Sequence, residues 1–339
     1  MPRIAINGLG RIGKLVFRRL FDIGLGSNLV LINDKHGTPE TIANVIAFDT
    51  VHGIWQKKIK VGKDQISVGS SKLIIDCSKT EELDELPLKK LDIDFVIDCT
   101  GNFNSFEKSS QYLSLGAKKV LVSAPINDDR VLNIVYGINH ELYQNQVNIV
   151  TSASCTTNCL APVVKVLNDN IGIHHGSITT IHNITNSQSI MDKPHKDLRR
   201  SRSAINSLIP STTGSAQAIS LIFPNLKGKL NGHAVRVPVM NSSLTDCVFE
   251  MKKKVSKTEV NCLFQLASET YLKGILGYET KQLVSADFLN NELSSIIDAP
   301  STMVVNDTQL KVYAWYDNEW GYSCRMVDML KLMIDQYEN

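Results

Sequence analysis

Two cysteines, Cys155 and Cys159, stand one helical turn apart in the segment SASCTTNCLAP (152–162). The pattern predicts the end of a strand followed by a helix that begins near Cys155. At such a position, backbone N–H groups and the helix dipole stabilise a thiolate and can hold an oxyanion. Cys159 lies one turn deeper, in the apolar run CLAPVVKVL, which indicates packing. Cys155 is therefore the candidate nucleophile.

A nucleophilic cysteine needs a base, and the strand-like segment TTIHNIT offers His182. An isolated histidine is more often a packed core residue than a catalyst. A zinc site that joined both cysteines to His174 and His175 would match no structural zinc spacing. A dithiol switch would prefer C-x-x-C. We expect no metal site. The residues alone predict a plausible Cys–His pair, and they do not exclude a packed histidine, a zinc site or a dithiol switch.

The segment INGLGRIG near the N-terminus has the G-x-G-x-x-G spacing of dinucleotide-binding turns. Gly8 would make the strand-to-helix turn, Gly10 would let backbone approach a pyrophosphate, and Gly13 would let helix and strand pack closely. The predicted helix (11–23) would point its positive end at the phosphates. An ordinary tight turn is the alternative to this interpretation.

The next predicted strand (28–34) ends in Asp34, with Lys35 beside it. A carboxylate at this point can accept hydrogen bonds from both adenosine ribose hydroxyls and repels a 2′-phosphate. Asp34 therefore favours NAD over NADP, and Lys35 softens that preference slightly. A solvated aspartate is the alternative.

Strand-like and helix-like patterns alternate in the first third of the chain, which predicts a parallel sheet covered by helices. From about residue 177, alternating segments predict a mixed or antiparallel sheet. We therefore expect an α/β protein with an N-terminal Rossmann dinucleotide-binding domain (1–154) and an α+β catalytic domain (155–318). The C-terminal helix (319–339) is expected to pack back on the first domain.

The 339 residues, 43% hydrophobic and 21% charged, fit a globular protein of two domains. No apolar run approaches the roughly 18 residues of a membrane span, and we expect no membrane association. The net charge of +2 indicates no nucleic acid as primary partner. Seven scattered cysteines and no export-type N-terminus favour a reducing, cytoplasmic location.

Seven motifs, spread in order over essentially the whole chain, together resemble one family. They are INGLGRIG, SASCTTNCLAP, TTIH, KDLRRSR, IPSTTGSA, GKLNGHAVRVPV and WYDNEWGY. This combination is similar to the phosphorylating, NAD-dependent glyceraldehyde-3-phosphate dehydrogenases of glycolysis and gluconeogenesis. The resemblance implies oxidation of glyceraldehyde 3-phosphate, with inorganic phosphate, to 1,3-bisphosphoglycerate. Cys155 would be the nucleophile of the thiohemiacetal and thioester, and His182 its base.

The resemblance also implies two anion sites. Thr185 and Arg236 would hold the phosphate of the substrate, where the hydroxyl of Ser187 could help. The residues implied for the attacking inorganic phosphate are Ser154, Thr156, Thr213, Gly214 and Arg199.

On the cofactor side, the resemblance implies that Arg11 and Ile12 line the pyrophosphate and that Asn318 fixes the carboxamide, with Tyr322 beside the ring. The remaining cofactor-binding residues that it implies are Asn7, Thr100, Gly101 and Ser123. The stretch 184–206 is similar to the family loop that reaches a neighbouring cofactor site, which implies a homotetramer.

Two alternatives remain beside this hypothesis. One is a specialised paralogue that uses erythrose 4-phosphate as substrate or arsenate as acceptor. The family that oxidises erythrose 4-phosphate usually lacks the STTG sequence found here, so IPSTTGSA favours phosphorolysis. The other alternative is a non-catalytic interaction protein on the same scaffold. The presence of every catalytic group argues against this alternative.

Overall fold

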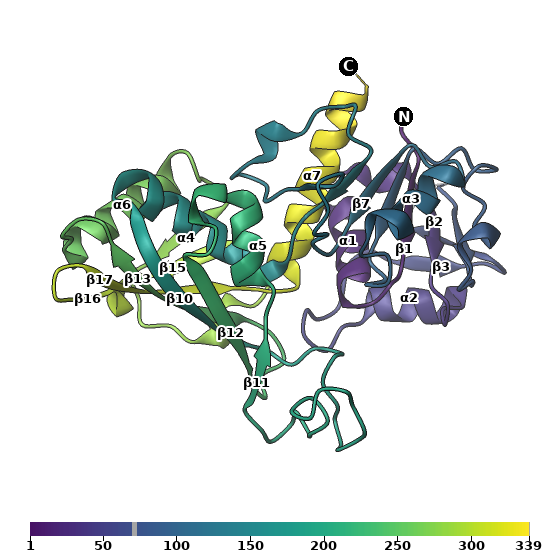
Figure 1. The fold of residues 1–339 in the computed structure, drawn as a ribbon. Helices are drawn as coiled ribbons and strands as arrows, with labels where there is room; N and C mark the ends of the chain where they lie inside the picture. Colours follow the sequence, from purple (N-terminus) through teal and green to yellow (C-terminus); the bar gives the residue numbers. More distant parts are fainter. Residues whose placement is uncertain (70–72, 339) are drawn as a thin grey trace. The chain divides into compact units, whose positions relative to one another are not determined.

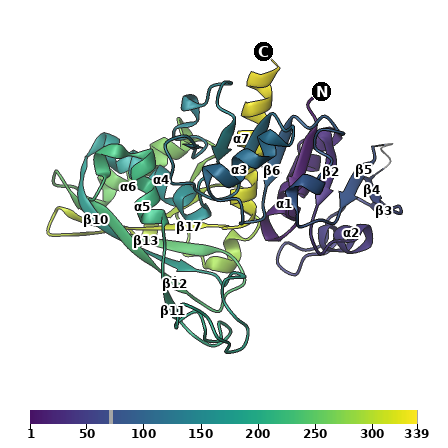
Figure 2. The same ribbon diagram turned by 45° about the vertical axis from the view of Figure 1, so that its right-hand side comes forward.

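The computed structural model describes residues 1–69 and 73–338. The chain divides into two compact units, one formed by Met1–Ala153 with Ser323–Asn339 and the other by Ser154–Tyr322. Figures 1 and 2 show the elements of each unit from two directions. Asn339, the end of the predicted C-terminal segment, lies outside the described residues.

The first unit contains a sheet built mostly of parallel strands. Its strands are β1 (Ile4–Asn7), β2 (Leu29–Asn33), β3 (Ile59–Val61), β4 (Gln65–Val68), β5 (Ile75–Ser78), β6 (Phe95–Asp98), β7 (Lys119–Val122), β8 (Leu132–Asn133) and β9 (Ile149–Thr151). Their order is β3-β4-β5-β2-β1-β6-β7-β9-β8, parallel from β5 onward. With β1 flanked by β2 and β6, this is the doubly wound order of dinucleotide-binding sheets.

Four helices belong wholly or mostly to the described part of this unit, and two of them begin at side-chain caps. The four helices are α1 (Arg11–Asp22), α2 (Pro39–Ala47), α3 (Phe106–Ser114) and α7 (Trp320–Tyr337). The Thr38 hydroxyl accepts a hydrogen bond from the Thr41 N–H before α2, and the Ser105 hydroxyl accepts one from Lys108 before α3. The predicted helix 11–23 is confirmed to within one residue, because Ile23 is the C-cap of α1.

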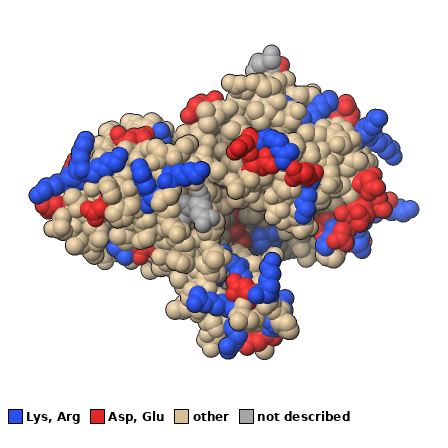
Figure 3. Space-filling view, viewed as in Figure 1, with Lys and Arg blue, Asp and Glu red and all other residues tan. Residues whose placement is uncertain are grey.

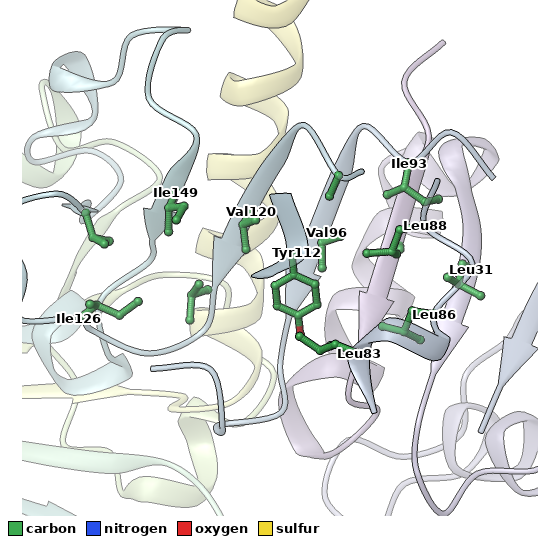
Figure 4. Packing of buried hydrophobic residues seen from close by; sticks show 14 residues of the cluster. Leu31, Leu83, Leu86, Leu88, Ile93, Val96, Tyr112, Val120, Ile126 and Ile149 are labelled. Carbon is green, nitrogen blue, oxygen red and sulfur yellow. The ribbon is translucent and has the colours of Figure 1, made fainter. Parts of the chain in front are cut away.

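Buried apolar side chains cover one face of this sheet, where Tyr112 of α3 lies over the strands (Figure 4). Val96 of β6 belongs to this cluster. The residue before Val96 on β6 is Phe95, and its side chain points to the opposite face because side chains alternate along a strand. There its ring meets the Tyr337 ring of α7, with 5.3 Å between centroids. Helices therefore pack on both faces of the sheet.

The second unit contains a mixed sheet. Its strands are β10 (Ile173–His182), β11 (Ile209–Thr212), β12 (Leu230–Arg236), β13 (Ser243–Met251), β14 (Leu276–Glu279), β15 (Ser295–Asp298), β16 (Met303–Val305) and β17 (Gln309–Tyr316). The order is β11-β12-β10-β13-β17-β15-β14, and β16 pairs with β17. Since β10 runs parallel to β12 and antiparallel to β13, the predicted mixed sheet is confirmed.

Three helices complete the described part of this unit: α4 (Cys155–Asn170), α5 (Ser215–Ile222) and α6 (Lys257–Glu269). Ser256 caps α6 by accepting a hydrogen bond from the Glu259 N–H, which is one half of the predicted capping box. None of the described helices combines the length and hydropathy needed to cross a membrane. On the face shown in Figure 3, basic and acidic side chains are both spread over the surface.

The glycines of the first turn give a prediction about packing. A Cβ on Gly13 would overlap the carbonyl oxygen of Gly8, whereas a Cβ on Gly10 would meet nothing within 4 Å. We expect Gly13→Ala to lower the free energy of unfolding by about 1–3 kcal/mol through overpacking, despite the better helix propensity of alanine. Gly10→Ala, the matched control, should change it by less than about 0.5 kcal/mol. Urea unfolding of the cofactor-free proteins measures both, and equal effects would contradict the packing role of Gly13.

Candidate active site

Cys155 is the first residue of α4, as the sequence predicts. Ser154 is the N-cap, and its hydroxyl accepts a hydrogen bond from the Thr157 N–H at 3.1 Å. Ala153 just before it has φ 51°, in the left-handed region that a non-glycine residue occupies at a cost. Strain of this kind is typical of functional turns. The turn leaves the Cys155 sulfur at the positive end of α4.

His182 is the last residue of β10, and its Nε2 lies 3.7 Å from the Sγ of Cys155. The imidazole is only 4% exposed. Cys159, by contrast, is fully buried beneath it, where the Thr245 hydroxyl donates to its sulfur. The structure thus brings the predicted pair together and places Cys159 in the packed interior.

Burial dominates the protonation of this pair. It raises the pKa of the Cys155 thiol, which the charge of Arg236 opposes. Burial, followed by the charge of Arg236, lowers the pKa of His182 to about 3. Burial raises the pKa of Cys159 to about 12. In the free protein these shifts favour a neutral thiol beside a neutral imidazole, which can act as a base.

Two groups compete for the other nitrogen of His182. Its Nδ1 lies 2.9 Å from the carbonyl oxygen of Asn183 and 2.6 Å from Nη1 of Arg236. A neutral imidazole nitrogen either donates or accepts, whereas a guanidinium only donates. Donation from Nδ1 to Asn183 leaves a lone pair on Nε2 facing Cys155, while a hydrogen bond from Arg236 removes it. The position of Arg236 therefore controls the tautomer.

The register of the sheet explains the place of Arg236. In the parallel pair of β10 and β12, His182 is opposite Arg236. The Nε atom of Arg236 is buried without a hydrogen-bond partner among the described residues. A buried, unsatisfied cationic donor is suited to an anion.

A chain of hydroxyl groups joins the N-termini of α4 and α5. The Ser154 hydroxyl lies 3.1 Å from that of Ser215, the first residue of α5, and the Thr213 hydroxyl donates to Ser215 at 3.1 Å. Gly214 is the N-cap of α5, where a Cβ would meet nothing within 4 Å. Two helix N-termini with converging hydroxyls favour an anion. The sequence analysis missed Ser215, although its position at a helix start was a usable signal.

Thr156 is held by a residue that the sequence analysis also missed. Its hydroxyl lies 2.9 Å from the Tyr316 hydroxyl, which in turn lies 2.8 Å from the hydroxyl of Thr180. Tyr316 is 1% exposed. This buried trio orients the first turn of α4, and no local sequence signal reveals it.

Arg200, which the sequence analysis did not name, lies beside residues predicted to bind the phosphate of the substrate. Arg199 is exposed, whereas Arg200 is partly buried and donates to the Ser187 hydroxyl at 2.8 Å. The charge of Arg200 also lowers the pKa of Arg236, after the larger effect of burial. The Ser187 hydroxyl lies 2.9 Å from that of Thr185. Arg200 thus stands with Thr185, Ser187 and Arg236. Arg199 stays a prediction for the inorganic-phosphate site.

The predicted cofactor residues of the first unit lie at the carboxyl ends of its strands. Gly8 follows β1 with φ 88°, a value that favours glycine. Asp34 follows β2, where its carboxylate accepts hydrogen bonds from the backbone N–H groups of Leu9 and His36, both at 3.0 Å. The space opposite Gly10 is open to a ligand that approaches the backbone. These features fit a dinucleotide.

Asn7 and the first turn of α1 belong to a polar framework. The Asn7 side chain donates to the Tyr112 hydroxyl at 2.6 Å and accepts from Asn33 at 2.7 Å. Arg11 and Ile12, which are predicted to line the pyrophosphate, are the first two residues of α1. The Arg11 side chain pairs with the buried carboxylate of Asp49.

The other predicted cofactor residues also follow strands. Thr100 and Gly101 come after β6, where the Thr100 N–H donates to Asp98 at 3.0 Å and Gly101 has φ 73°. The Ser123 N–H, just after β7, donates to the Asp98 carbonyl oxygen. In the second unit, Asn318 accepts from the Ser243 hydroxyl at 2.8 Å, and the nearby Tyr322 is buried.

The zinc alternative gains no support from the structure. His174 and His175 begin β10 and contact each other, with 2.7 Å between their Nδ1 atoms. Within residues 1–69 and 73–338, no group of three or more histidine, cysteine or acidic side chains could hold a metal ion. None of the seven cysteines, all of which lie within the described ranges, forms a disulfide.

A doubly wound dinucleotide-binding sheet, in a chain that also carries a cysteine against a buried histidine, defines a cofactor-dependent dehydrogenase that works through a thiol. Two family models match the chain. The NAD binding domain of glyceraldehyde 3-phosphate dehydrogenase matches residues 2–106, and the C-terminal domain matches residues 154–318. The chain belongs to the glyceraldehyde-3-phosphate dehydrogenase family, which confirms the resemblance, the α/β fold class and NAD as cofactor.

Curated relatives agree over nearly the full length. Glyceraldehyde-3-phosphate dehydrogenase 3 of Nostoc sp. is 48% identical over 331 residues, covering 97% of either chain. Glyceraldehyde-3-phosphate dehydrogenase 2 of Bacillus subtilis is 46% identical, covering 97% of this chain and 96% of that one. The Staphylococcus aureus protein of the same name is 47% identical, covering 96% and 94%. These matches do not favour the erythrose 4-phosphate, arsenate or non-catalytic alternatives.

The two cysteines of α4 should differ sharply in reactivity. We expect iodoacetamide to label Cys155 first and abolish activity, because the high pKa of the buried Cys159 keeps it a thiol. Cys155→Ser should be inactive, and Cys159→Ser should fold and keep much activity. Peptide mass mapping in a Cys262→Ser background measures labelling, because Cys262 is exposed. Preferential labelling of Cys159 would contradict the assignment.

The pH dependence of alkylation tests the base. Since burial raises the pKa of Cys155, the rate should rise with pH as the thiolate fraction grows. His182→Asn should slow alkylation near neutral pH, because the thiol loses its proton acceptor. An unchanged rate would show that the helix N-terminus alone activates the thiol.

Proposed function

We propose that this chain oxidises D-glyceraldehyde 3-phosphate to 1,3-bisphosphoglycerate with NAD and inorganic phosphate, in glycolysis and gluconeogenesis. The observation that carries the proposal is the Cys155–His182 contact at the start of α4, in a member of this family. The side chains that act on the substrate belong to the second unit, and those that would hold most of the cofactor belong to the first.

The first step forms a bond between the Cys155 sulfur and the aldehyde carbon. His182 takes the thiol proton at Nε2 while the sulfur attacks the carbonyl carbon, and then returns this proton to the former carbonyl oxygen, which gives a thiohemiacetal and a neutral His182. The phosphate of the substrate binds Arg236 and Thr185, with Arg200 and Ser187 nearby. As Arg236 turns to this anion, Nδ1 of His182 is free to donate to Asn183, and Nε2 keeps the lone pair that a base needs. Substrate binding thereby favours the active tautomer.

The second step removes hydride and leaves a thioester on Cys155. His182 accepts the proton of the thiohemiacetal hydroxyl as the carbonyl forms. Bound NAD supplies the acceptor for the hydride. The cofactor residues of the first unit suit it, since Asp34 keeps two carboxylate oxygens that can each accept one more hydrogen bond, from the ribose hydroxyls. Asn318 would hold the carboxamide, and Tyr322 the ring.

The third step transfers the acyl group to phosphate. The hydroxyls of Ser154, Thr156 and Thr213 lie at the N-termini of α4 and α5 and are suited to bind inorganic phosphate near the thioester. An oxygen of this phosphate attacks the acyl carbon, the carbon–sulfur bond breaks, and the thiolate is regenerated. The product is an acyl phosphate.

We also propose a cytoplasmic homotetramer. Five large apolar side chains of the segment 190–208 are exposed in the single chain: Ile190 (68%), Met191 (74%), Leu198 (82%), Ile205 (56%) and Leu208 (69%). Exposed apolar side chains of this density support contact with another copy. Free thiols throughout the described residues support a reducing compartment.

Phosphate should be required for multiple turnovers, because a thioester hydrolyses slowly in water. Without phosphate we expect about one NADH per active site followed by slow turnover, and with phosphate or arsenate many turnovers. The absorbance of NADH after rapid mixing measures both phases. Fast turnover without any acceptor would refute phosphorolysis and indicate hydrolysis.

The two neighbouring arginines provide a matched pair for the anion sites. Arg200→Ala should raise the Michaelis constants for the anionic substrates about tenfold or more, since a charged hydrogen bond contributes about 1.5–3 kcal/mol. Arg199→Ala should change them by less than about twofold. Thr213→Ala should raise the Michaelis constant for inorganic phosphate more than that for glyceraldehyde 3-phosphate. Arg236→Ala should have the opposite effect. Equal effects of Arg199→Ala and Arg200→Ala would contradict the proposal that Arg200 contributes more than Arg199 to anion binding.

A further inference from the structure

The carboxylate of Asp34 is held in one orientation by two backbone N–H groups. Its Oδ2 accepts a hydrogen bond from the Leu9 N–H and its Oδ1 one from the His36 N–H, both at 3.0 Å. This carboxylate cannot turn away from a ligand without losing these bonds. A 2′-phosphate on the adenosine ribose would therefore meet a fixed negative charge.

Lys35 is the cation nearest in sequence to this carboxylate, and it is already paired. Its Nζ lies 2.8 Å from Oε1 of Glu81, and the two side chains are 43% and 70% exposed. The hydrogen bond from Lys35, followed by its charge, lowers the pKa of Glu81, so this partner is ionised at neutral pH. Lys35 can offset the charge of a phosphate only by leaving Glu81.

The position of Glu81 is fixed by the segment that follows β5. The Asn33 amide donates to the Thr80 carbonyl oxygen at 3.0 Å, and the Thr80 N–H donates back to Asn33 Oδ1 at 3.0 Å. Both side chains are buried. This reciprocal pair ties the residue before Glu81 to the end of β2, two positions before Lys35. The acidic partner is thus held by the fold opposite Lys35.

From these contacts we propose that Glu81 is a specificity-determining residue. By pairing with Lys35, it keeps the adenosine ribose site selective for a free 2′-hydroxyl over a 2′-phosphate. An isolated exposed ion pair contributes little to stability, but here it neutralises the cation that would otherwise compensate Asp34. The inference rests on the proposed role of Asp34 in the cofactor site.

The test compares two small probes that need no turnover, adenosine 5′-phosphate and adenosine 2′,5′-bisphosphate. Their dissociation constants for the full-length protein are measured by calorimetry at low ionic strength. Glu81→Gln should tighten binding of the bisphosphate about three- to tenfold, because Lys35 becomes free to contact the 2′-phosphate. Binding of the monophosphate should change by less than about twofold.

Two further variants separate a freed lysine from a general loss of negative charge. Glu82→Gln removes the same charge at the next position, where the acid is not paired with Lys35, and should change bisphosphate binding by less than about twofold. Adding Lys35→Met to Glu81→Gln should abolish the gain. The proposal is overturned if Glu81→Gln leaves the ratio of the two constants unchanged, if Glu82→Gln gives the same gain, or if the gain persists without Lys35.

Failure of the underlying function would have a different signature. Asp34→Gly should weaken binding of adenosine 5′-phosphate and reduce the preference for it over adenosine 2′,5′-bisphosphate. If it leaves both probes unchanged, the cofactor-site assignment fails and this inference fails with it. If only Glu81→Gln is silent, the inference alone fails. Absence of aldehyde-dependent NADH formation would refute the proposed reaction without affecting the binding result.

Discussion

The contact between the Cys155 sulfur and Nε2 of His182 is the constraint around which the second unit is arranged. Its 3.7 Å separation requires α4 to begin at Cys155 and β10 to end at His182. Both side chains lie where burial favours their neutral forms. A neutral pair can remain buried without the large cost of an unpaired charge. The proton then moves when a substrate is in place.

Arg236 links this pair to the anion that the substrate carries. A buried guanidinium with an unpartnered Nε is unfavourable in the free protein, and its contact with Nδ1 of His182 satisfies only part of its donors. A phosphate group would complete those hydrogen bonds and release the ring. Electrostatic strain in the free site and selectivity for a phosphorylated aldehyde thus follow from the same side chain.

How much of this was predictable depends on whether the signal is local. The signals at Gly8, Gly13 and the helix start at Cys155 are local, so sequence spacing was sufficient to predict the Rossmann sheet and the helix that begins at Cys155. Tyr316 was not predictable, because it reaches Thr156 and Thr180 only after β17, β13 and β10 assemble side by side. The contact of Arg200 with Ser187 likewise depends on the direction of a side chain, which the motif KDLRRSR does not encode.

Charge placement follows different rules in the two units. In the second, buried Arg236 is left partly unsatisfied, which suits a site that must bind and release anions. In the first, each charge near the end of β2 has a partner: backbone N–H groups hold Asp34, and Glu81 holds Lys35. A site with satisfied charges gains little from an added phosphate and retains its preference for a neutral ribose. The same protein can therefore recognise phosphate strongly at its substrate sites and reject it at the adenosine ribose, because the difference lies in whether its cations are already paired.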